Sequence, residues 1–379
     1  MSSVPDFEEV PRRPTFAEID LNAYARNLEV FRRALPAGSK LIAVLKANGY
    51  GHGAIQLARE CEQSGTAMLA VAMLEEALEL RQAGISLPIL ILGALTTDQV
   101  PVAVEKGFVQ GIVGPEQLRD ACALARADSA SFPIHLKLDT GMGRVGLVEA
   151  DLPEAITLLS GAKGVKVEGI YTHLSAASDP GHPLTSAQLE RFRTMLATLE
   201  EGGIAAPLHH IANSAAVVQG LVEPGDFVRA GMILLGGETL DRGDNRLEPV
   251  LQWTTRIIRL KEVPSGSFVG YGASFQTKRT SLIATLPVGY ADGYNRLLSN
   301  RGEVLIRGRR APVAGRVSMD LVSVDVTDVP DVAVDDPVVL LGSQGGERMA
   351  AEEFAEKIGT IPYEVVCAIS SRVPRIYLK

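Results

Sequence analysis

Between residues 16 and 237, short apolar runs alternate with longer amphipathic segments, and this alternation restricts the possible folds more than any other feature of the sequence. Each run has the length of a buried strand and is too short for a helix. The segments between the runs are rich in Ala, Leu and Glu and have helical periodicity, for example at 75–82, 116–127 and 185–199. Strands that alternate with helices predict a parallel sheet with helical crossovers.

Eight such runs are present, at residues 41–45, 68–72, 88–93, 109–113, 133–138, 166–171, 208–211 and 227–235. Eight strand–helix units over about 200 residues match a closed (β/α)8 TIM barrel better than an open doubly wound sheet. In such barrels the chemistry lies at the carboxyl ends of the strands. Residues that follow each run are therefore the candidates for a site.

The pattern changes beyond residue 235. The segment GGETLDRGDNRLEP has the Gly, Asp and Arg content of a linker, and the chain from residue 250 onward is rich in β-branched residues and in Gly and Pro turns. Only 350–358 has a helical pattern there. The sequence predicts a barrel at 1–245 and a mostly β domain at 246–379. The strand-like segment 15–20 leaves it open whether residues 1–20 pack with the β domain.

Charge and cysteine content exclude several classes of protein. The net charge is -8 and no basic stripe occurs, so no nucleic-acid partner is expected. Cys61, Cys122 and Cys367 lie far apart in apolar surroundings, which predicts reduced, buried thiols and a cytoplasmic protein. No apolar stretch could span a membrane, and the histidines form no metal-binding motif, so neither a membrane nor a metal is expected.

The stretch LIAVLKANGYGHG carries Lys46 at the end of the first run, followed by glycines and a tyrosine that break the strand. An amine at the end of a buried strand has two chemical uses. It can pair with a carboxylate, or it can form a Schiff base with a carbonyl group. Taken alone, this stretch favours a simple strand-end lysine that reaches solvent.

Further candidates follow the later runs. The segment LKLDTGMGRVG has glycines at G-x-G-x-x-G spacing, but it lies mid-chain, so a tight barrel loop that presents Arg144 inward is favoured over a dinucleotide site. Taken alone, a solvent-facing Arg144 is about equally favoured. His173 follows the sixth run. Asn213 and Ser214 follow the seventh, where barrels often bind phosphate. Arg229 lies within the eighth run, and a guanidinium in an apolar run is costly unless it is paired.

In the β domain, Tyr271, Tyr290, Met319 and Asp320 lie in Gly-containing segments that predict turns, and Tyr363 follows a proline. Taken singly, each of these residues is expected to be a turn or packing residue.

The ordered set KANGYGHG, LDTGMGR, THLSAAS, HxANSAA, VRAGM, VGYGASF, VGYADG, GRVSMD and RVPRIY resembles the alanine racemases. The resemblance runs from residue 16 to residue 377. It implies a pyridoxal 5′-phosphate enzyme with a (β/α)8 barrel and a carboxyl-terminal β domain. It also implies a head-to-tail homodimer in which each active site combines one barrel with the partner's β domain.

Racemisation removes a proton from one face of the α-carbon and returns it on the other, so it requires two bases. By resemblance, Lys46 is the Schiff-base lysine and one base, and Tyr271 of the other subunit is the opposite base. His173, itself held by Arg229, is implied to assist Tyr271.

The resemblance also assigns the residues around the cofactor and the substrate. The phosphate-binding positions correspond to Tyr50, Ser214, Gly231 and Tyr363, with Met232 as a further backbone N–H donor and Asn213 beside it. Arg229 is implied to face the pyridine nitrogen, and Arg144 to lie near the cofactor's phenolic oxygen. The residues implied near the substrate are Tyr290, Met319 and Asp320, and Lys137 matches a lysine that is often carbamylated in this family.

One motif departs from the family pattern. The family's S-Y-G-A-T-Y is here G-Y-G-A-S-F around Tyr271, which keeps the tyrosine but makes substrate preference less certain. The favoured function is alanine racemase, supplying D-alanine for peptidoglycan or acting in alanine catabolism. A broader amino-acid racemase, a barrel-type decarboxylase and a non-catalytic cofactor-holding protein remain as alternatives. A decarboxylase needs no opposite-face base, and a cofactor holder needs no β domain.

Overall fold

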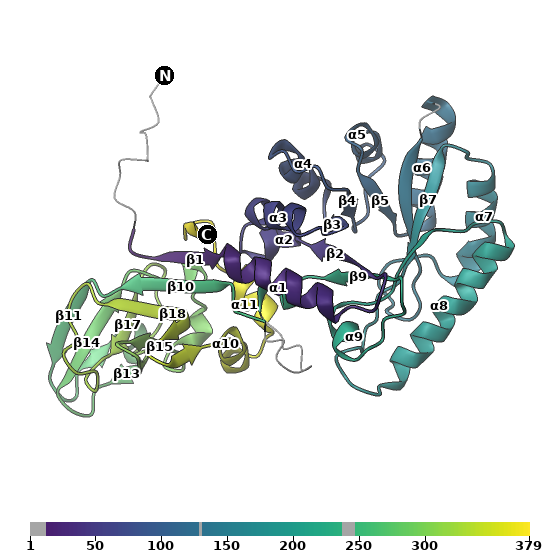
Figure 1. The fold of residues 1–379 in the computed structure, drawn as a ribbon. Coiled ribbons are helices and arrows are strands. Elements are labelled where there is room, and N and C mark those ends of the chain that lie inside the picture. The colour runs from purple at the N-terminus through teal and green to yellow at the C-terminus, as the bar shows by residue number, and fades with distance from the viewer. Residues whose placement is uncertain (1–12, 129–130, 237–246) are drawn as a thin grey trace, which may run out of the picture. The chain divides into compact units, whose positions relative to one another are not determined.

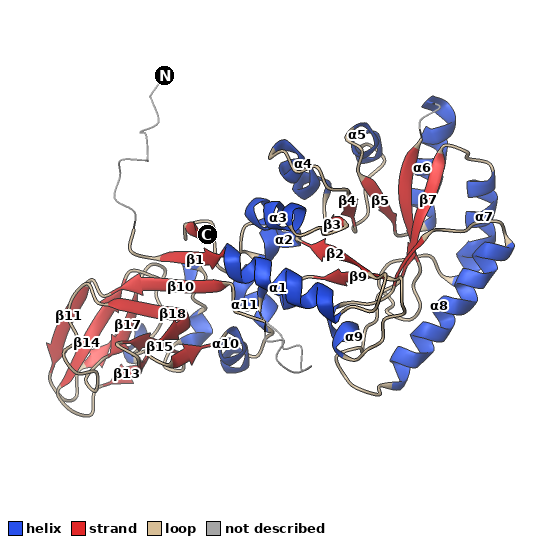
Figure 2. Cartoon of the chain, in the orientation of Figure 1, coloured by secondary structure: helices blue, strands red, loops and turns tan. Residues whose placement is uncertain are grey.

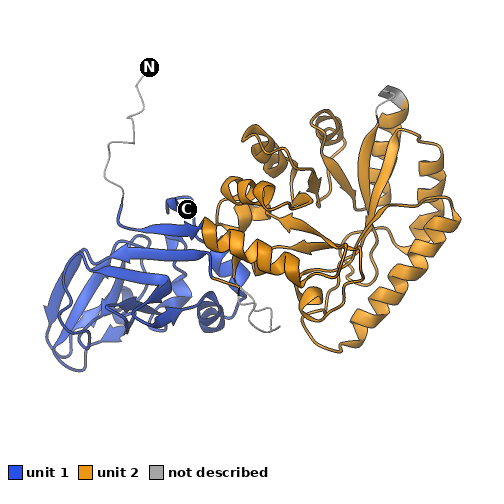
Figure 3. Ribbon diagram, in the orientation of Figure 1, with its two compact units in different colours: residues 1–20, 249–379 blue, residues 21–248 orange. Residues whose placement is uncertain are grey.

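The computed structural model describes residues 13–128, 131–236 and 247–379. It divides into two compact units, Met1–Asp20 with Pro249–Lys379, and Leu21–Glu248 (Figure 3). The first strand of the chain thus belongs to the unit that contains the carboxyl-terminal residues. Among the helices within the described residues, none is both long and apolar enough to cross a membrane.

Eight parallel strands of Leu21–Glu248 form a nearly closed barrel, as far as the described residues show (Figure 1). Their order is β8-β7-β6-β5-β4-β3-β2-β9, and the N–H of Arg229 donates to the carbonyl of Ala212 at 3.0 Å, which joins the segment after β8 to β9. The predicted (β/α)8 barrel is confirmed. The strands are β2 (Lys40–Val44), β3 (Met68–Val71), β4 (Ile89–Ile91), β5 (Val109–Ile112), β6 (Phe132–Lys137), β7 (Val165–Tyr171), β8 (Leu208–His210) and β9 (Phe227–Ala230).

The helices lie outside the strands, as Figure 2 shows. Apolar side chains of α6 and α8, such as Leu118 and Phe192, pack with Ile134 and Leu136 of β6, so the helices bury the outer face of the barrel. The three amphipathic segments predicted as helices are confirmed as α4, α6 and α8. The helical segments are α1 (Leu21–Ala34), α2 (Lys46–Tyr50), α3 (Ala54–Gln63), α4 (Leu74–Gln82), α5 (Gln99–Glu105), α6 (Pro115–Asp128), η1 (Glu149–Asp151), α7 (Leu152–Ser160), α8 (Pro183–Glu201), α9 (Ser214–Val218) and η2 (Met232–Leu235).

The prediction of a strand at 227–235, the eighth apolar run, is wrong for the second half of this run. Strand β9 ends at Ala230, Gly231 turns the chain with φ -129° and ψ -99°, and the following residues form the short 3-10 helix η2. Every residue of η2 is buried. A fully buried apolar run has no period that separates a strand from a helix, so the sequence could not show this break.

The other unit is mostly β, which confirms the predicted carboxyl-terminal domain type. Its main sheet has the order β16-β15-β18-β10-β1-β20, and β1 pairs antiparallel with β10 and parallel with β20. Buried side chains such as Trp253, Tyr294 and Leu305 form its core. The strands are β1 (Phe16–Asp20), β10 (Leu251–Arg256), β11 (Arg259–Val263), β12 (Phe268–Val269), β13 (Phe275–Gln276), β14 (Ser281–Leu286), β15 (Glu303–Ile306), β16 (Arg309–Pro312), β17 (Val322–Asp325), β18 (Pro337–Gln344), β19 (Glu347–Met349) and β20 (Arg375–Leu378).

Two expectations for this unit need correction. Besides α10 (Ala351–Ile358), a second helix, α11 (Pro362–Cys367), follows it, and its first residue is a proline, which suits a helix start. Cys61 and Cys122 are buried, but Cys367 at the end of α11 is exposed in this chain. The expectation of three buried thiols is therefore wrong for Cys367.

Candidate active site

Lys46 directly follows β2 and begins the turn α2, which is not an ordinary right-handed helix. Ala47, Asn48, Gly49 and Tyr50 have φ values of 53°, 53°, 60° and 53°. This left-handed backbone costs roughly 1–2 kcal/mol for each residue that carries a side chain. Internal hydrogen bonds close the turn, from Gly49 N–H to the Leu45 carbonyl at 2.8 Å and from Gly51 N–H to the Ala47 carbonyl at 2.9 Å. The turn leaves Lys46 exposed at the carboxyl end of β2.

Tyr50 ends this turn and lies against Gly231. A Cβ atom at Gly231 would lie 2.3 Å from the Tyr50 hydroxyl, so only glycine allows this approach. The N–H groups of Gly231 and Met232 donate no hydrogen bond to another residue that the structure describes. A phenol and two such backbone donors on neighbouring segments could hold an anion.

Asn213 follows β8 and caps α9, whose first residue is Ser214. The Asn213 side chain accepts the N–H of Ala216 at 3.0 Å, which caps α9, and its amide donates to the Leu174 carbonyl at 3.2 Å. A backbone bridge pairs Asn213 with Arg229. Asn213 thereby fixes Ser214, the first residue of α9, beside the end of β9.

Arg229 on β9 is buried, and carbonyl oxygens surround its guanidinium group. Its Nη2 atom donates to the carbonyls of Thr172 at 2.6 Å and Ile211 at 3.2 Å, and Nη1 donates to the carbonyl of His210. Burial lowers the pKa of Arg229 to about 10, so the group stays charged at neutral pH. The expectation that a guanidinium in this apolar run needs partners is therefore met by hydrogen bonds to carbonyl oxygens.

Arg229 also fixes the tautomers of two histidines. Its Nη2 atom lies 3.3 Å from Nδ1 of His173 and its Nη1 atom lies 2.9 Å from Nδ1 of His210. A guanidinium can only donate, so both Nδ1 atoms accept, and a neutral ring then carries its proton on Nε2. Burial, followed by the charge of Arg229, lowers the pKa of His173 to about 3 and keeps this ring neutral.

A buried aromatic and imidazole cluster inside the barrel continues this network. His210 Nε2 lies 2.8 Å from His135 Nδ1, and the His210 ring stacks on Tyr171 at 4.4 Å. A Cβ at Gly169 would lie 2.7 Å from the His135 ring, and one at Gly111 would lie 2.8 Å from the Tyr171 hydroxyl. These two glycines make room for the large side chains at the centre of the barrel.

The roles of His135, Tyr171 and His210 were not predicted from the sequence. A signal was present for His135 only, because His135 and Lys137 alternate with apolar residues in the run 133–138 and so lie on one face of the strand. The adjacent residues His209 and His210 face opposite ways on β8, as neighbours on a strand do: His210 lies in the barrel interior, while His209 contacts Phe192 of α8.

Lys137 lies at the end of β6 and is buried. Its Nζ atom lies 5.9 Å from the centre of the Tyr171 ring. Burial, and next the positive charges of Arg144 and Arg229, lower the pKa of Lys137 to about 8. About one in ten of these amines is therefore uncharged at pH 7.

The G-x-G-x-x-G segment forms a loop closed on its own carboxylate. The Asp139 side chain accepts the N–H groups of Gly141, Met142, Gly143 and Arg144 at distances between 2.9 and 3.1 Å. These backbone donors, which would face a phosphate in a dinucleotide site, are already used. The loop exposes the Arg144 side chain beside Lys137 and His173, whose pKa values its charge lowers.

The remaining candidates lie on the β-rich unit. Tyr271 starts the short 3-10 helix η3 (Tyr271–Ala273) between two glycines with φ of 75° and 69°, and 71% of its surface is exposed. Tyr363 lies in the first turn of α11, rather than in a bare turn after its proline. The exposed phenol of Tyr271 on this short turn is accessible to a second molecule.

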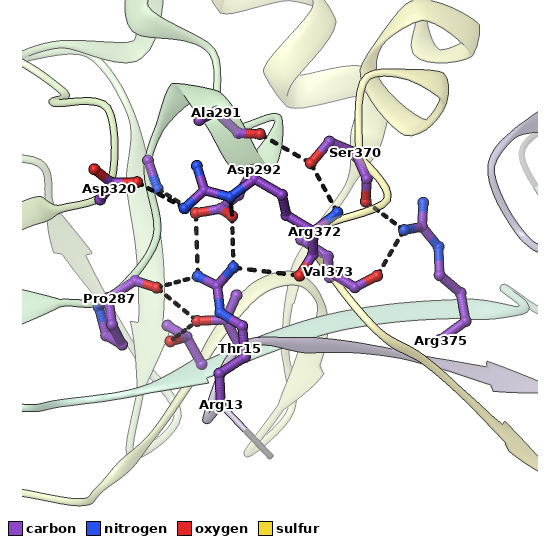
Figure 4. A network of polar contacts seen from close by, with 12 residues as sticks. Arg13, Thr15, Pro287, Ala291, Asp292, Asp320, Ser370, Arg372, Val373 and Arg375 are labelled. Carbon is purple, nitrogen blue, oxygen red and sulfur yellow. Dashed lines mark hydrogen bonds and ion pairs between the residues drawn. The ribbon is translucent and has the colours of Figure 1, made fainter. Parts of the chain in front are cut away.

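Tyr290, Met319 and Asp320 are brought together by paired loops. The N–H of Tyr290 donates to the Ser318 carbonyl at 3.0 Å, and the N–H of Ala291 donates to the Met319 carbonyl at 3.1 Å. Asp320 accepts a hydrogen bond from Arg372 at 2.7 Å (Figure 4). These residues therefore form one surface group on the β-rich unit.

The sequence is similar to known proteins along nearly its whole length. Family models for the alanine racemase N-terminal and C-terminal domains match residues 19–239 and 250–377. The alanine racemase of Halothermothrix orenii is 42% identical over 367 residues, which cover 96% of this chain and 97% of that protein.

Solved structures agree with these matches. The alanine racemase from D-cycloserine-producing Streptomyces lavendulae has a TM-score of 0.92 at 37% identity, and the match covers 97% of this chain and 98% of that one. The alanine racemase from Bartonella henselae, solved with covalently bound pyridoxal phosphate, has a TM-score of 0.87 at 28% identity and covers 97% of this chain and 100% of its own. From these matches along nearly its whole length, we conclude that this chain belongs to the alanine racemase family.

Proposed function

We propose that this protein interconverts L-alanine and D-alanine with pyridoxal 5′-phosphate as its cofactor. The observation that carries the proposal is the similarity to alanine racemases along 96% of the chain. The proposal includes a homodimer with shared active sites. It also includes a cytoplasmic role in supplying D-alanine for peptidoglycan.

The residues at the barrel mouth fit the proposed cofactor. Lys46 would bind it covalently. The phenol of Tyr50 and the N–H groups of Gly231 and Met232 would hold its phosphate, since these two N–H groups lack an acceptor within the described chain. Ser214, with Asn213 beside it, and Tyr363 are assigned to the same phosphate by resemblance.

Two arginines would orient the cofactor ring. Arg229 donates hydrogen bonds but cannot accept them, so it would keep the pyridine nitrogen facing it unprotonated. Arg144 would lie near the phenolic oxygen. When bound, the cofactor withdraws electrons from the α-carbon of the amino acid and makes its hydrogen acidic.

Two bases on opposite faces would move the proton. Lys46 would serve one face, and Tyr271 of the partner subunit would serve the other. Because Nδ1 of His173 accepts from Arg229, its Nε2–H is available as a donor. A hydrogen bond from this donor would stabilise the tyrosinate form of the partner's Tyr271.

The substrate carboxylate would lie near Met319, Asp320 and Tyr290 of the partner subunit, and Arg144 would supply a positive charge to it. The hydrogen bond from Arg372 holds Asp320 in place at 2.7 Å. Alanine has a small side chain, so preference for it would depend on how closely these loops approach.

We propose in addition that Lys137 is carbamylated. Its pKa of about 8 leaves enough neutral amine to attack carbon dioxide, forming a nitrogen–carbon bond and releasing a proton. The product is a carbamate anion beside two arginines. This anion would pair with Arg144, which the lysine cation repels.

Chiral chromatography tests the proposed function most directly. The cofactor-saturated protein is incubated with a mixture of L-amino acids, and a Lys46→Ala variant is the control. D-alanine alone, absent with the control, is the expected product. Several D-amino acids would instead indicate a broad racemase, and no D-amino acid would contradict racemisation.

A further inference from the structure

The carboxylate of Glu76 contacts the turn that presents Lys46. Its Oε1 atom accepts the N–H of Ala47 at 2.6 Å. We propose that Glu76 is a positioning residue for Lys46 and that its carboxylate keeps the lysine in the geometry for binding the cofactor. This inference rests on the proposed function, because it concerns the lysine that would carry pyridoxal phosphate.

The peptide that Glu76 holds is the one joining Lys46 to Ala47. A hydrogen bond to this N–H restricts ψ of Lys46 and φ of Ala47, which is 53°. Further hydrogen bonds close the turn on itself and on the segment just after it, for example from Gly53 N–H to the Asn48 carbonyl at 2.9 Å. The hydrogen bond from Ala47 to Glu76 differs from these, because it joins the turn to the start of α4.

The second oxygen of Glu76 caps the helix α4. Oε2 accepts the N–H groups of Ala72 at 2.7 Å and Met73 at 3.2 Å, which hold the start of α4 after β3. A glutamate at the third position of a helix commonly caps it in this way. The cap accounts for Oε2 only, and the contact of Oε1 with Ala47 is additional to it.

The carboxylate therefore links the ends of two adjacent barrel strands, β2 and β3. Each oxygen faces N–H donors only, so both positions require an acceptor. A glutamine at position 76 has one acceptor oxygen and one donor amide. If its oxygen keeps the two cap contacts, its amide meets the N–H of Ala47, and the two donors repel.

This asymmetry gives a specific substitution with a matched control. Glu76→Gln is expected to keep α4 capped and to release the lysine-bearing turn. Glu75→Gln changes the preceding residue of the same helix, whose carboxylate is exposed and accepts a long hydrogen bond of 3.4 Å from Gln99. Ala47→Gly provides a rescue, because glycine adopts a φ of 53° without steric cost and needs less external support.

The first measurement uses the cofactor-free full-length protein. Hydrogen exchange, read by mass spectrometry, is compared between the peptide covering residues 46–53 and peptides from α8. Glu76→Gln is expected to speed exchange in the first peptide alone by about tenfold, the effect of losing one charge-assisted hydrogen bond. Equal exchange in Glu76→Gln and the wild type would overturn the proposal.

The second measurement is the attachment of pyridoxal phosphate, followed by absorbance and by mass after borohydride reduction. Attachment at Lys46 is expected to slow about tenfold in Glu76→Gln, to stay normal in Glu75→Gln and to recover in Glu76→Gln/Ala47→Gly. A slower rate that the second substitution does not recover would assign Glu76 to the helix cap alone. If the wild type attaches nothing at Lys46, the proposed function fails instead, and the exchange measurement still tests Glu76.

Discussion

Arg13 binds the carboxylate of Asp292 with both terminal nitrogens, at 2.6 Å and 3.2 Å, across 279 residues of sequence (Figure 4). The Asp292 side chain is fully buried. It also accepts the N–H of Gly289 at 3.0 Å, and Arg372 lies 3.6 Å away. Arg13, which lies just before β1, is thus bound to the loop that carries Tyr290.

Asp292→Asn is expected to destabilise the β-rich unit by about 2–3 kcal/mol, because a buried charged acceptor loses its charge while Arg13 keeps its own. Trp253 is the only tryptophan of the sequence and is buried in this unit, so its fluorescence reports the unfolding of this unit. Denaturant titration followed by this signal gives the free energy of unfolding.

Asp328→Asn is the control for Asp292→Asn. Asp328 pairs with Arg279 in the same unit, but 82% of its side chain is exposed. An exposed pair contributes at most about 1 kcal/mol. Equal losses in the two variants would contradict a special role of Asp292.

Shared active sites predict activity from two inactive variants. In a hybrid of Lys46→Ala and Tyr271→Phe chains, one site has both native residues and the other has neither. Random exchange of equal amounts gives half hybrids, so about a quarter of the wild-type activity is expected. The double variant Lys46→Ala/Tyr271→Phe, mixed with Lys46→Ala, is the control and should recover nothing. No recovery after demonstrated subunit exchange would argue against shared sites.

Carbamylation of Lys137 predicts a labelled adduct and a rescue. With a pKa of about 8, about one in ten of these amines is neutral at pH 7, against fewer than about one in a thousand for an ordinary lysine. Carbon-13 bicarbonate should give a carbamate signal that is absent in Lys137→Ala. Small carboxylates should restore part of the activity of that variant. A wild-type protein without the signal would leave Lys137 as a cation among arginines.

The barrel could be predicted because strands covered on both faces leave continuous apolar runs in the sequence. Residues that follow these runs, such as Lys46 and His173, could be placed at the mouth by the same rule. Their chemical roles came from the resemblance, since a lone lysine or histidine has a simpler structural explanation.

The left-handed turn after Lys46 could not be predicted from local preference. Ala47 and Tyr50 both have φ of 53°, which side chains disfavour, so contacts distant in sequence stabilise the turn. Glu76 contributes one contact, and the close approach of Tyr50 to Gly231 contributes another. The buried His135–His210 pair was missed for a related reason, because the pairing depends on which residues face inward on two separate strands.

The buried histidines predict how stability depends on pH. Burial, and next the charge of Arg229, lower the pKa of His135 to about 4, and the same causes lower the pKa values of His173 and His210. In the unfolded chain the histidine side chains bind protons below about pH 6.5, whereas in the folded barrel His135 binds a proton only near pH 4. The stabilisation is therefore complete above pH 6.5 and is lost as the pH falls from 6.5 towards 4.

At pH 5, His135 alone should destabilise the folded barrel by about 2 kcal/mol relative to pH 7. Circular dichroism of the helices, most of which belong to the barrel unit, measures the thermal midpoint at each pH. His135→Gln keeps an acceptor for His210 but cannot be protonated, so its midpoint should fall less between pH 7 and pH 5 than that of the wild type. His182→Asn is the control, because His182 caps α8 through Nδ1 at 3.1 Å and asparagine preserves such a cap. If His135→Gln and the wild type lose stability in parallel, the buried histidine pair does not set the acid limit of this fold.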